Sequence, residues 1–325
     1  MLLKDLYLAI VAPGLLAAGI VALVCVWFER KIAALVQHRY GPYRICKRLE
    51  GLLQPVADFI KLILSEPVIP HEVNKFLYVA LPILLDTLAI LPVAFMPIAP
   101  GLVIIDNSYS LFIVLAILLA ISLIVALIGW VASDKFTYIG TVREVLQALS
   151  YEVVLILVII SVVIMYGTGS IVDIVLHQRY IPGALVNPLS FILFIICALM
   201  ATSRFPFEIP EAETEIVFGP FTEYSGSLFA LAMFSVYLEI YTYSLLGTCL
   251  FLGGWWGPGA EISPMFATGW TYVKTVILSF FMVFLRAAYP RLRIDQVLKL
   301  STKALVLLGF AACILSIIVK YAHVL

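Results

Sequence analysis

The sequence predicts an all-α, polytopic membrane protein with about eight transmembrane helices and one amphipathic helix at the membrane surface. Hydrophobic residues make up 63% of the 325 residues, and charged residues only 12%. The mean hydropathy of +1.11 corresponds to more apolar surface than a soluble domain buries. Apolar runs long enough to cross about 30 Å of hydrocarbon also recur along the whole chain.

The transmembrane helices are expected, in order, at residues 6–28, 76–98, 110–132, 147–168, 188–203, 223–252, 268–289 and 303–322, of which the fifth is short. The first run is too long for a signal peptide and ends in Glu29-Arg30-Lys31 without a clear cleavage site, so we interpret it as a retained helix. No repeat or low-complexity linker divides the chain. Residues 1–325 are therefore expected to form a single integral membrane domain.

A shorter amphipathic helix is expected at residues 52–65. Its apolar residues recur at helical spacing, and Asp58 and Lys61 on the other face are expected to form an i,i+3 ion pair. Pro55 suits its start, and Glu66-Pro67 ends it. Because it is too short to span, it should lie along the membrane surface or cover the mouth of a cavity. The preceding basic turn, residues 37–42, suits an anionic partner surface or lipid headgroups.

The uneven distribution of Lys and Arg indicates the orientation. Segments 30–75, 133–150, 204–222 and 286–303 hold eight, two, one and five of the twenty. The opposite side holds only Lys4, Arg179 and Lys320. By the positive-inside rule the four basic segments face the cytoplasm, and both termini are expected outside the cell membrane.

An acidic stretch, residues 204–226, follows the fifth span. It holds five of the twenty acids: Glu208, Glu211, Glu213, Glu215 and Glu223. Pro206, Pro210 and Gly219-Pro220 exclude one unbroken helix, so a structured loop with short turns is expected. Crowding and burial raise the pKa of carboxyl groups, which suits proton exchange near neutral pH. A solvated loop is the alternative, but large apolar residues interleave the acids.

Four charged residues are expected inside the membrane: Asp86 in the second span, Glu152 in the fourth, Glu239 in the sixth and Lys274 in the seventh. An ionisable group at this depth costs a few kcal/mol unless it faces a polar interior. One such residue could be a structural hydrogen bond between helices. Four of them, with both signs, favour a buried polar pathway.

Composition argues against several other kinds of site. The five cysteines are scattered singly and the four histidines are dispersed, so no metal or iron–sulfur site is visible. The net charge is zero and there is no long basic run, so nucleic acid is not an expected partner. The chain has only three Asn and five Gln but abundant Ile and Val, a composition that favours a thermophilic source.

Eight motifs occur in order over nearly the whole chain: Glu29-Arg30-Lys31, Gln37-x-Arg39-x-Gly41-Pro42, Leu52-Leu53-Gln54-Pro55-x-Ala57-Asp58-x-x-Lys61, Gly129-Trp130, Ser150-Tyr151-Glu152, Pro206-Phe207-x-x-Pro210-Glu211-Ala212-Glu213-x-Glu215, Glu223-Tyr224-Ser225 and Arg286-Ala287-x-x-Pro290-Arg291-x-Arg293-x-Asp295-Gln296. Together they resemble the H subunit of bacterial complex I, the mitochondrial subunit-1 family. The resemblance implies an eight-helix subunit that joins the membrane arm of a redox-driven ion pump to its electron-transfer arm.

The resemblance also gives roles to the charged residues. The ion or proton relay would comprise Asp86, Glu152, Glu208, Glu211, Glu213, Glu215, Glu223, Glu239 and Lys274. The junction of the two arms, with a quinone-like cavity beside the surface helix, would comprise Arg30, Arg39, Asp58, Lys61, Phe207, Arg286, Arg291 and Arg293.

Partners and cofactors follow from the same resemblance. The implied partners are hydrogenase-like large and small peripheral subunits, antiporter-like and small membrane subunits, and membrane lipid. Iron–sulfur clusters would lie in neighbouring subunits, and this chain would bind no cofactor itself beyond a quinone contact. The subunit would belong to an NADH- or ferredoxin-dependent oxidoreductase and would not be catalytic alone.

Two departures from the family pattern bear on the electron acceptor. In the first, Gly41-Pro42 leads into residues 43–48, Tyr-Arg-Ile-Cys-Lys-Arg, whereas the family has Asn and then a glycine-bearing linker. In the second, the acid of the sixth span is Glu239, whereas the family has its glutamate three residues earlier, at the position of Val236. That shift moves the carboxylate about 4.5 Å along the helix axis. Both departures favour ferredoxin-fed relatives, such as membrane-bound hydrogenases and sulfur-reducing complexes, over the quinone-reducing form. The pumped ion, H⁺ or Na⁺, stays open.

Two other classes of function remain as alternatives. A stand-alone secondary ion transporter would use Glu152, Glu239 and Lys274 as its ion site and would transport ions when isolated. A pure membrane anchor for a soluble reductase would tolerate neutralisation of the buried acids.

Overall fold

The computed structural model describes residues 8, 10–11, 13–43, 45 and 47–322, apart from the side chains of Lys47 and Glu213. Within these residues the chain is helical, and its one β-type pairing is a bridge between Ala99 and Leu102. The all-α prediction is confirmed. The longer elements are α2 (Leu15–Val36), α3 (Gln54–Ile63), α4 (Lys75–Ile90), α5 (Ser110–Ala132), α6 (Lys135–Tyr166), α9 (Pro188–Ala201), α11 (Gly226–Phe251), α12 (Pro264–Ala288) and α14 (Val306–Tyr321). The shorter ones are η1 (Lys47–Leu49), η2 (Leu91–Phe95), α7 (Ile171–His177), α8 (Gly183–Val186), α10 (Glu213–Ile216), η3 (Gly219–Phe221), α13 (Ile294–Leu300) and the π-helical η4 (Ser301–Leu305).

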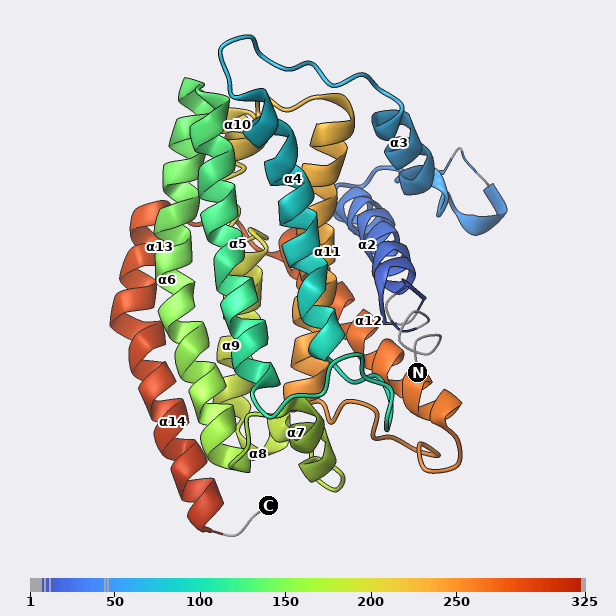
Figure 1. The fold of residues 1–325 in the computed structure, drawn as a ribbon, viewed down its shortest axis with the longest axis vertical. Helices are drawn as coiled ribbons and strands as arrows, with labels where there is room; N and C mark the ends of the chain where they lie inside the picture. Colours follow the sequence, from blue (N-terminus) through green and yellow to red (C-terminus); the bar gives the residue numbers. More distant parts are fainter. Residues whose placement is uncertain (1–7, 9, 12, 44, 46, 323–325) are drawn as a thin grey trace.

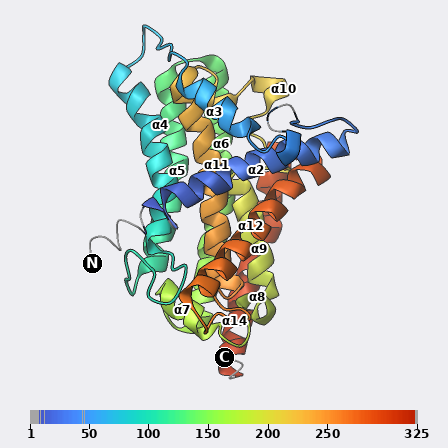
Figure 2. The same cartoon turned by 90° about the vertical axis from the view of Figure 1, so that its right-hand side faces the viewer.

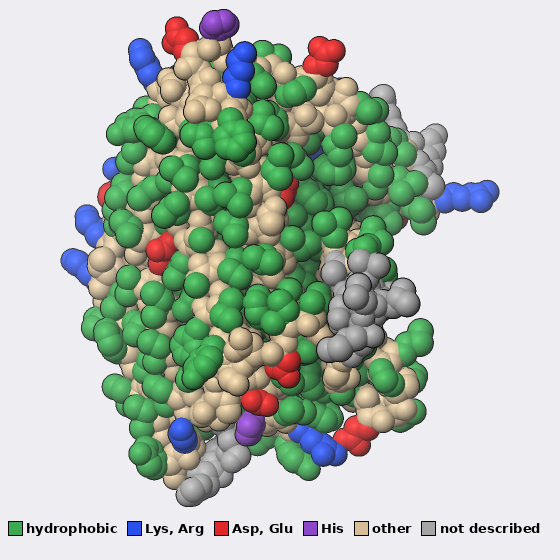
Figure 3. Space-filling view, in the orientation of Figure 1, with side chains coloured by type: hydrophobic (Ala, Val, Ile, Leu, Met, Phe, Trp, Pro, Cys, Tyr) green, Lys and Arg blue, Asp and Glu red, His purple; other side chains and the backbone are tan. Residues whose placement is uncertain are grey.

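Six helices among the described residues are long and apolar enough to cross a membrane. They are Lys75–Phe95, Ser110–Ala132, Lys135–Tyr166, Gly226–Phe251, Pro264–Ala288 and Ile294–Tyr321. In the space-filling view, hydrophobic side chains cover most of the bundle face, and many of the charged ones gather toward its two ends (Figure 3). The chain is therefore a multi-pass membrane protein, as the sequence predicts.

The elements differ from the expected spans in three places. Helix α6 begins at Lys135 and not near residue 147, because the Asp134 side chain caps it by accepting the N–H of Phe136 at 2.8 Å. Most of segment 133–150 is therefore helix. Helix α9 has only 14 residues. Helix α2 continues past Glu29 to Val36, while residues 6, 7, 9 and 12 of the first expected span lie outside the described residues.

The helices form a bundle around a continuous apolar core. Helices α4, α5, α6 and α11 stand side by side, α9 lies behind α6, and α14 packs along α6 (Figure 1). Helices α2 and α12 run obliquely across one face of this bundle and contact each other and α11 (Figure 2). Residues of both oblique helices line the first of the cavities described below.

The acidic stretch folds as a loop with short turns, as predicted. It contains only α10 and η3, and it packs against α6. The contact is close because two glycines meet: a Cβ on Gly140 would lie 2.6 Å from the Gly219 Cα. Gly219 itself has φ +54°, and a Cβ there would lie 1.9 Å from the carbonyl oxygen of Pro210. The absence of side chains at Gly140 and Gly219 therefore allows the loop to pack directly on the backbone of α6.

The predicted surface helix is α3, which begins with Pro55 in its first turn and contacts α2 and α11. The predicted pair between Asp58 and Lys61 is wrong. Asp58 instead forms an ion pair with Arg30 and accepts a hydrogen bond from the Gln54 side chain at 3.1 Å. Packing of α3 on α2 supplies the nearer cation and leaves Lys61 exposed.

Candidate functional site: two cavities and the ion pairs between them

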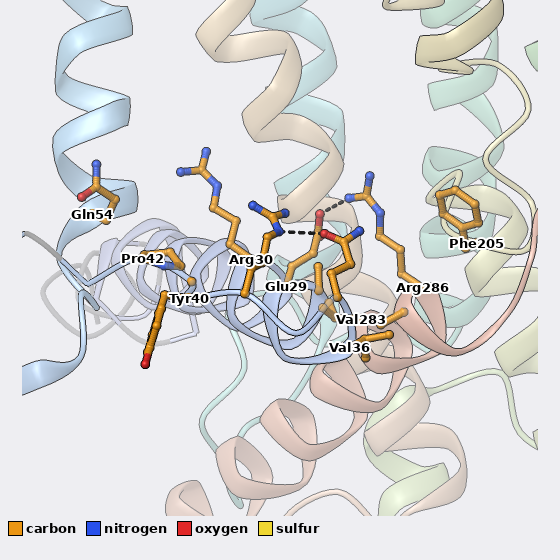
Figure 4. A pocket seen from close by; sticks show the side chains of 14 residues that line it. Glu29, Arg30, Val36, Tyr40, Pro42, Gln54, Phe205, Val283 and Arg286 are labelled. Atoms are coloured by element: carbon orange, nitrogen blue, oxygen red, sulfur yellow. Dashed lines mark hydrogen bonds and ion pairs between the residues drawn. The ribbon is translucent and has the colours of Figure 1, made fainter.

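A cavity of about 680 Å³ opens where the C-terminal part of α2 meets the start of α3 and the end of α12. We call it the junction cavity. Three cations, Arg30, Arg39 and Arg286, line it together with the Gln54 side chain and the Phe205 ring. In the close-up, Arg286 faces Glu29 across the cavity wall and Phe205 lies beyond it (Figure 4). The cavity thus combines positive charge, amide groups and apolar surface.

A network of four charged side chains closes the inner side of the junction cavity. Glu29 accepts from Arg204 Nη1 at 3.0 Å and also pairs with Arg286. Arg286 Nη2 donates in turn to Glu208 Oε1 at 2.7 Å. Tyr237 completes the set, because its hydroxyl donates to Glu29 at 3.3 Å and its ring lies 4.5 Å from the Arg204 guanidinium. Residues from α2, α11, α12 and the acidic stretch are thereby held together.

Burial makes this network energetically sensitive. The side chains of Arg204 and Glu208 are 5% and 10% exposed. Burial alone disfavours the charged form of Arg204, but Tyr237 and the carboxylates of Glu211 and Glu208 more than offset it and raise the pKa of the guanidinium. The charged forms of Arg204 and Arg286 therefore depend on the carboxylates that they contact. Removing one carboxylate would leave a buried positive charge uncompensated.

A second, internal cavity of about 30 Å³ lies between α6, α11 and the acidic stretch. Its wall carries three carboxyl groups, those of Glu144, Glu211 and Glu239. Ser203 donates to Glu144 Oε2 at 3.3 Å. Ser122, also in the wall, donates to Glu152 at 2.7 Å. The cavity is large enough for one water molecule.

One turn of backbone connects the two spaces. Ser203 bonds Glu144 at the internal cavity, and its neighbour Arg204 bonds Glu29 at the junction network. Within the acidic stretch, Glu208 faces the network and Glu211 faces the internal cavity. A displacement of this turn therefore acts on both spaces.

The remaining acids of the loop have other surroundings. Glu215 is bound by Arg143 at 2.6 Å and by Arg291. The hydrogen bond from Arg143 lowers the pKa of Glu215, helped by Arg291, whereas crowding was expected to raise it. The backbone carbonyl of Glu223 accepts the Tyr78 hydroxyl at 2.7 Å. The Glu213 side chain lies outside the described part of the structure.

Other predicted site residues lie away from both spaces. Phe207 is buried in the core, and Arg293 pairs with Asp295 at 3.2 Å on the surface. Asp86 borders an apolar groove between α2, α4 and α11 that does not include the carboxyl groups of the internal cavity. The ammonium of Lys274 donates to the backbone carbonyls of Leu252, Gly254 and Trp256 at 2.6–3.0 Å. Lys274 thus holds the loop that follows α11.

Three charged residues of the site are not identified by sequence reasoning: Glu29, Glu144 and Arg204. Glu29 extends the buried stripe of Ala18, Ala22 and Cys25, which follows helical spacing. Glu144 lies in a segment expected to be a connection, although the buried residues Thr137, Gly140, Thr141, Gln147 and Ala148 mark the same helical face. Arg204 is the one cation among the acids of 204–222, which is the signal that could have identified it as a counter-charge.

Metal ligands do not gather in the described residues: no three His, Cys, Asp or Glu side chains lie close enough together to hold an ion. Cys25, Cys197 and Cys249 are separate and buried, and Cys46 lies outside the described residues.

The chain is similar to known proteins over most of its length. A family model described as NADH dehydrogenase matches residues 8–317. The chain is 35% identical over 294 residues to the NADH-quinone oxidoreductase H subunit of Dehalococcoides mccartyi strain CBDB1, a match that covers 90% of this chain and 81% of the relative. It is 35% identical over 318 residues to the corresponding protein of Syntrophotalea carbinolica, 94% of each chain. With that of Geobacillus kaustophilus the identity is 33% over 326 residues, 98% of this chain and 92% of the relative.

Proposed function

This chain belongs to the NADH dehydrogenase family, and on that premise we propose that it links the electron-transfer arm of a complex-I-type oxidoreductase to the ion-pumping membrane arm. Its partners are then peripheral redox subunits at the acidic-stretch end and further membrane subunits along the bundle. Electron transfer takes place in the peripheral subunits. This chain transmits the resulting change in charge to carboxyl groups inside the membrane.

The observation that carries this proposal is the ion-pair network between the two cavities. A charge that appears in the junction cavity acts on Glu29 and Arg286, the two members of the network that line it. Arg286 shares Glu29 with Arg204, so any change in one pair alters the other. Arg204 adjoins Ser203, which holds Glu144 at the internal cavity. The network is a contiguous set of contacts in which two cations share Glu29, and a set of this kind can carry coupling between two sites.

The complex has two candidate forms: one reduces a quinone, and the other is fed by ferredoxin and needs no quinone as electron acceptor. The junction cavity has the volume of a small-molecule site, and its wall offers both apolar groups and donors such as Gln54 and Arg30. These features support contact with a quinone headgroup. The unusual linker at residues 43–48, directly after the cavity residue Pro42, supports a ferredoxin-fed complex that needs no quinone.

A quinone-site inhibitor separates the two candidates. The linker predicts that the intact complex oxidises ferredoxin without added quinone and resists such inhibitors. Inhibition at one inhibitor per complex, or a quinone that copurifies in the junction cavity, would contradict this prediction and establish the quinone-reducing form.

The coupling role itself is tested by comparing the complex with the isolated chain in liposomes. The complex should move ions only while its electron donor is oxidised. The isolated chain should move none, because it lacks the redox step that changes the charge. Sustained ion exchange by the isolated chain would show a stand-alone transporter and would refute the proposal.

A further inference from the structure

A further cavity, of about 720 Å³, lies between the segment that follows α7, the loop that follows α11, and α12. We call it the α7 cavity. It is at the end of the bundle opposite the acidic stretch, where α7 and α8 also lie (Figure 1). Among the described residues that line it, two are cations, Arg179 and Lys274, and one is an acid, Glu261. The α7 cavity therefore carries one positive charge in excess of its negative charge.

Lys274 is the source of this excess. Its half-buried ammonium is held by three backbone carbonyls at 2.6–3.0 Å and, within the described part of the chain, contacts no carboxylate. Carbonyl oxygens satisfy its N–H groups but carry no net charge, so the positive charge of Lys274 is not neutralised. A cation that is half removed from water is costly without a counter-charge. An anion in the cavity would offset this cost.

Arg179 supplies hydrogen-bond donors for such an anion. Its Nη2 donates to Glu261 Oε1 at 2.5 Å. Its guanidinium carbon also lies 5.4 Å from the centre of the Trp256 ring and 5.6 Å from that of Tyr180. A guanidinium has five N–H donors, so the contact with Glu261 leaves others for a second acceptor. Phosphate is the anion that suits this group best, because it accepts two parallel hydrogen bonds from arginine.

The surroundings of the α7 cavity are those of a membrane surface. Tyr180 and Trp256 line it, and aromatic residues of this kind gather at the level of lipid headgroups. On α12, Phe266, Val273 and Ile277 are exposed and share one helix face that adjoins Lys274. This apolar face leads from the cavity along a helix long enough to cross the membrane. A free phosphate would make no use of it, whereas the acyl chains of a lipid would.

We propose that the α7 cavity binds an anionic phospholipid, a role beyond the coupling function. The lipid phosphate accepts hydrogen bonds from Arg179, and its acyl chains lie along the exposed face of α12. Lys274 attracts the phosphate by its charge and keeps its three carbonyl partners. The bound lipid thereby joins the segment after α7 to α12.

Photoactivatable lipids test the proposal at this one site of the complete complex. The complex is titrated with phosphatidylglycerol that carries a diazirine in its headgroup, and labelled peptides are identified by mass spectrometry. Residues 178–182 and 252–262 should be labelled. Arg179→Gln should raise the lipid concentration for half-maximal labelling of these peptides about tenfold, as expected for loss of a charge-assisted hydrogen bond. Arg179→Lys should give an intermediate value, because it keeps the charge and loses the paired donors.

Two controls separate a specific site from general attraction of charge. Arg293→Gln removes another exposed arginine that is paired with an acid, and it should leave the labelling of these peptides unchanged. Phosphatidylethanolamine with the same diazirine, which has no net charge, should label them at least about tenfold more weakly, because it brings no negative charge to offset Lys274.

Three results would overturn the proposal. Equal labelling of the parent and Arg179→Gln would remove Arg179 from the site. Equal labelling by the two lipids would show that net negative charge is not recognised. Inorganic phosphate that abolishes the labelling at the concentration of the lipid would show that the site takes free phosphate and that the apolar face of α12 contributes nothing.

Discussion

Glu29 is the residue on which the ion pairs converge, because it accepts from both Arg204 and Arg286. Its side chain is 11% exposed, so water screens these pairs little. The pair of Arg179 and Glu261 is a natural contrast, since its side chains are 49% and 63% exposed. An ion pair at Glu29 should therefore contribute much more to the free energy of unfolding than the exposed pair of Arg179 and Glu261.

Substitution of these two acids should show the contrast. Glu29→Gln leaves two guanidinium groups facing a neutral amide, and we expect it to destabilise the chain by about 3–5 kcal/mol. Glu261→Gln should cost about 1 kcal/mol or less. Thermal unfolding of the purified complex measures both, and equal midpoints for the two variants would contradict the assigned weight of the network.

Glu215 predicts a dependence on pH. Its hydrogen bonds from Arg143 and Arg291 lower its pKa in the folded state, so the stabilisation is complete above the pKa of the unfolded chain. It is lost as the pH falls through the lower, folded value. Because the Glu215 side chain is 43% exposed, the effect should be small. Stability measured from pH 7 downward should fall less in Glu215→Gln than in the parent; identical curves would contradict this.

At the scale of elements, composition and apolar periodicity were enough to predict the all-α class and the surface helix, and the positions of proline and glycine predicted the loop character of the acidic stretch. Boundaries were harder. A cap at Asp134 lengthens α6, and this hid Glu144 in an expected connection. The relation of α2 to the bundle depends on packing with α11 and α12, which no local pattern contains. Hence the pairing of Asp58 with Arg30 could not be predicted from spacing alone.

The glycine contact between α6 and the acidic stretch gives a prediction at this scale. A Cβ at residue 140 would press on the backbone of Gly219, which cannot rotate away. Gly140→Ala should therefore destabilise by about 1–3 kcal/mol. Gly269→Ala in α12 is the matched control, because nothing lies within 4 Å of its added Cβ, and it should be neutral or stabilising by up to about 1 kcal/mol. Thermal unfolding that does not separate the two variants would contradict the close approach.

At the scale of the whole molecule, the two ends of the bundle carry different groups. The acidic stretch and the start of α4 lie at one end, and α7 and α8 lie at the other (Figure 1). The distribution of Lys and Arg predicts that the first end faces the cytoplasm. This orientation places the junction cavity on the side where peripheral redox subunits would bind.

Labelling with a membrane-impermeant thiol reagent tests the orientation. In a background without native cysteines, a cysteine replacing Ile262, which is 79% exposed at the second end, should react in intact cells. A cysteine replacing Thr214, exposed on the acidic stretch, should react only after the membrane is opened. The opposite order would reverse the topology.

The site was only partly predictable for a related reason. Glu211 and Glu239 stood out because acids are rare in an apolar sequence, and the structure brings them to one cavity. Glu29 and Arg204 are far apart in sequence, so only the fold reveals their pairing. Lys274 stood out equally, yet three backbone carbonyls hold it at the loop after α11.

The most direct test of the central claim is the number of ions moved per electron in the reconstituted complex carrying Glu208→Gln. Glu208 contacts Arg286 at 2.7 Å and belongs to the network, whereas electron transfer occurs in neighbouring subunits in this account. The account predicts that donor oxidation continues while ion translocation per electron falls at least about tenfold, with Glu261→Gln unchanged as the control. An unchanged ratio in Glu208→Gln would contradict coupling through the network.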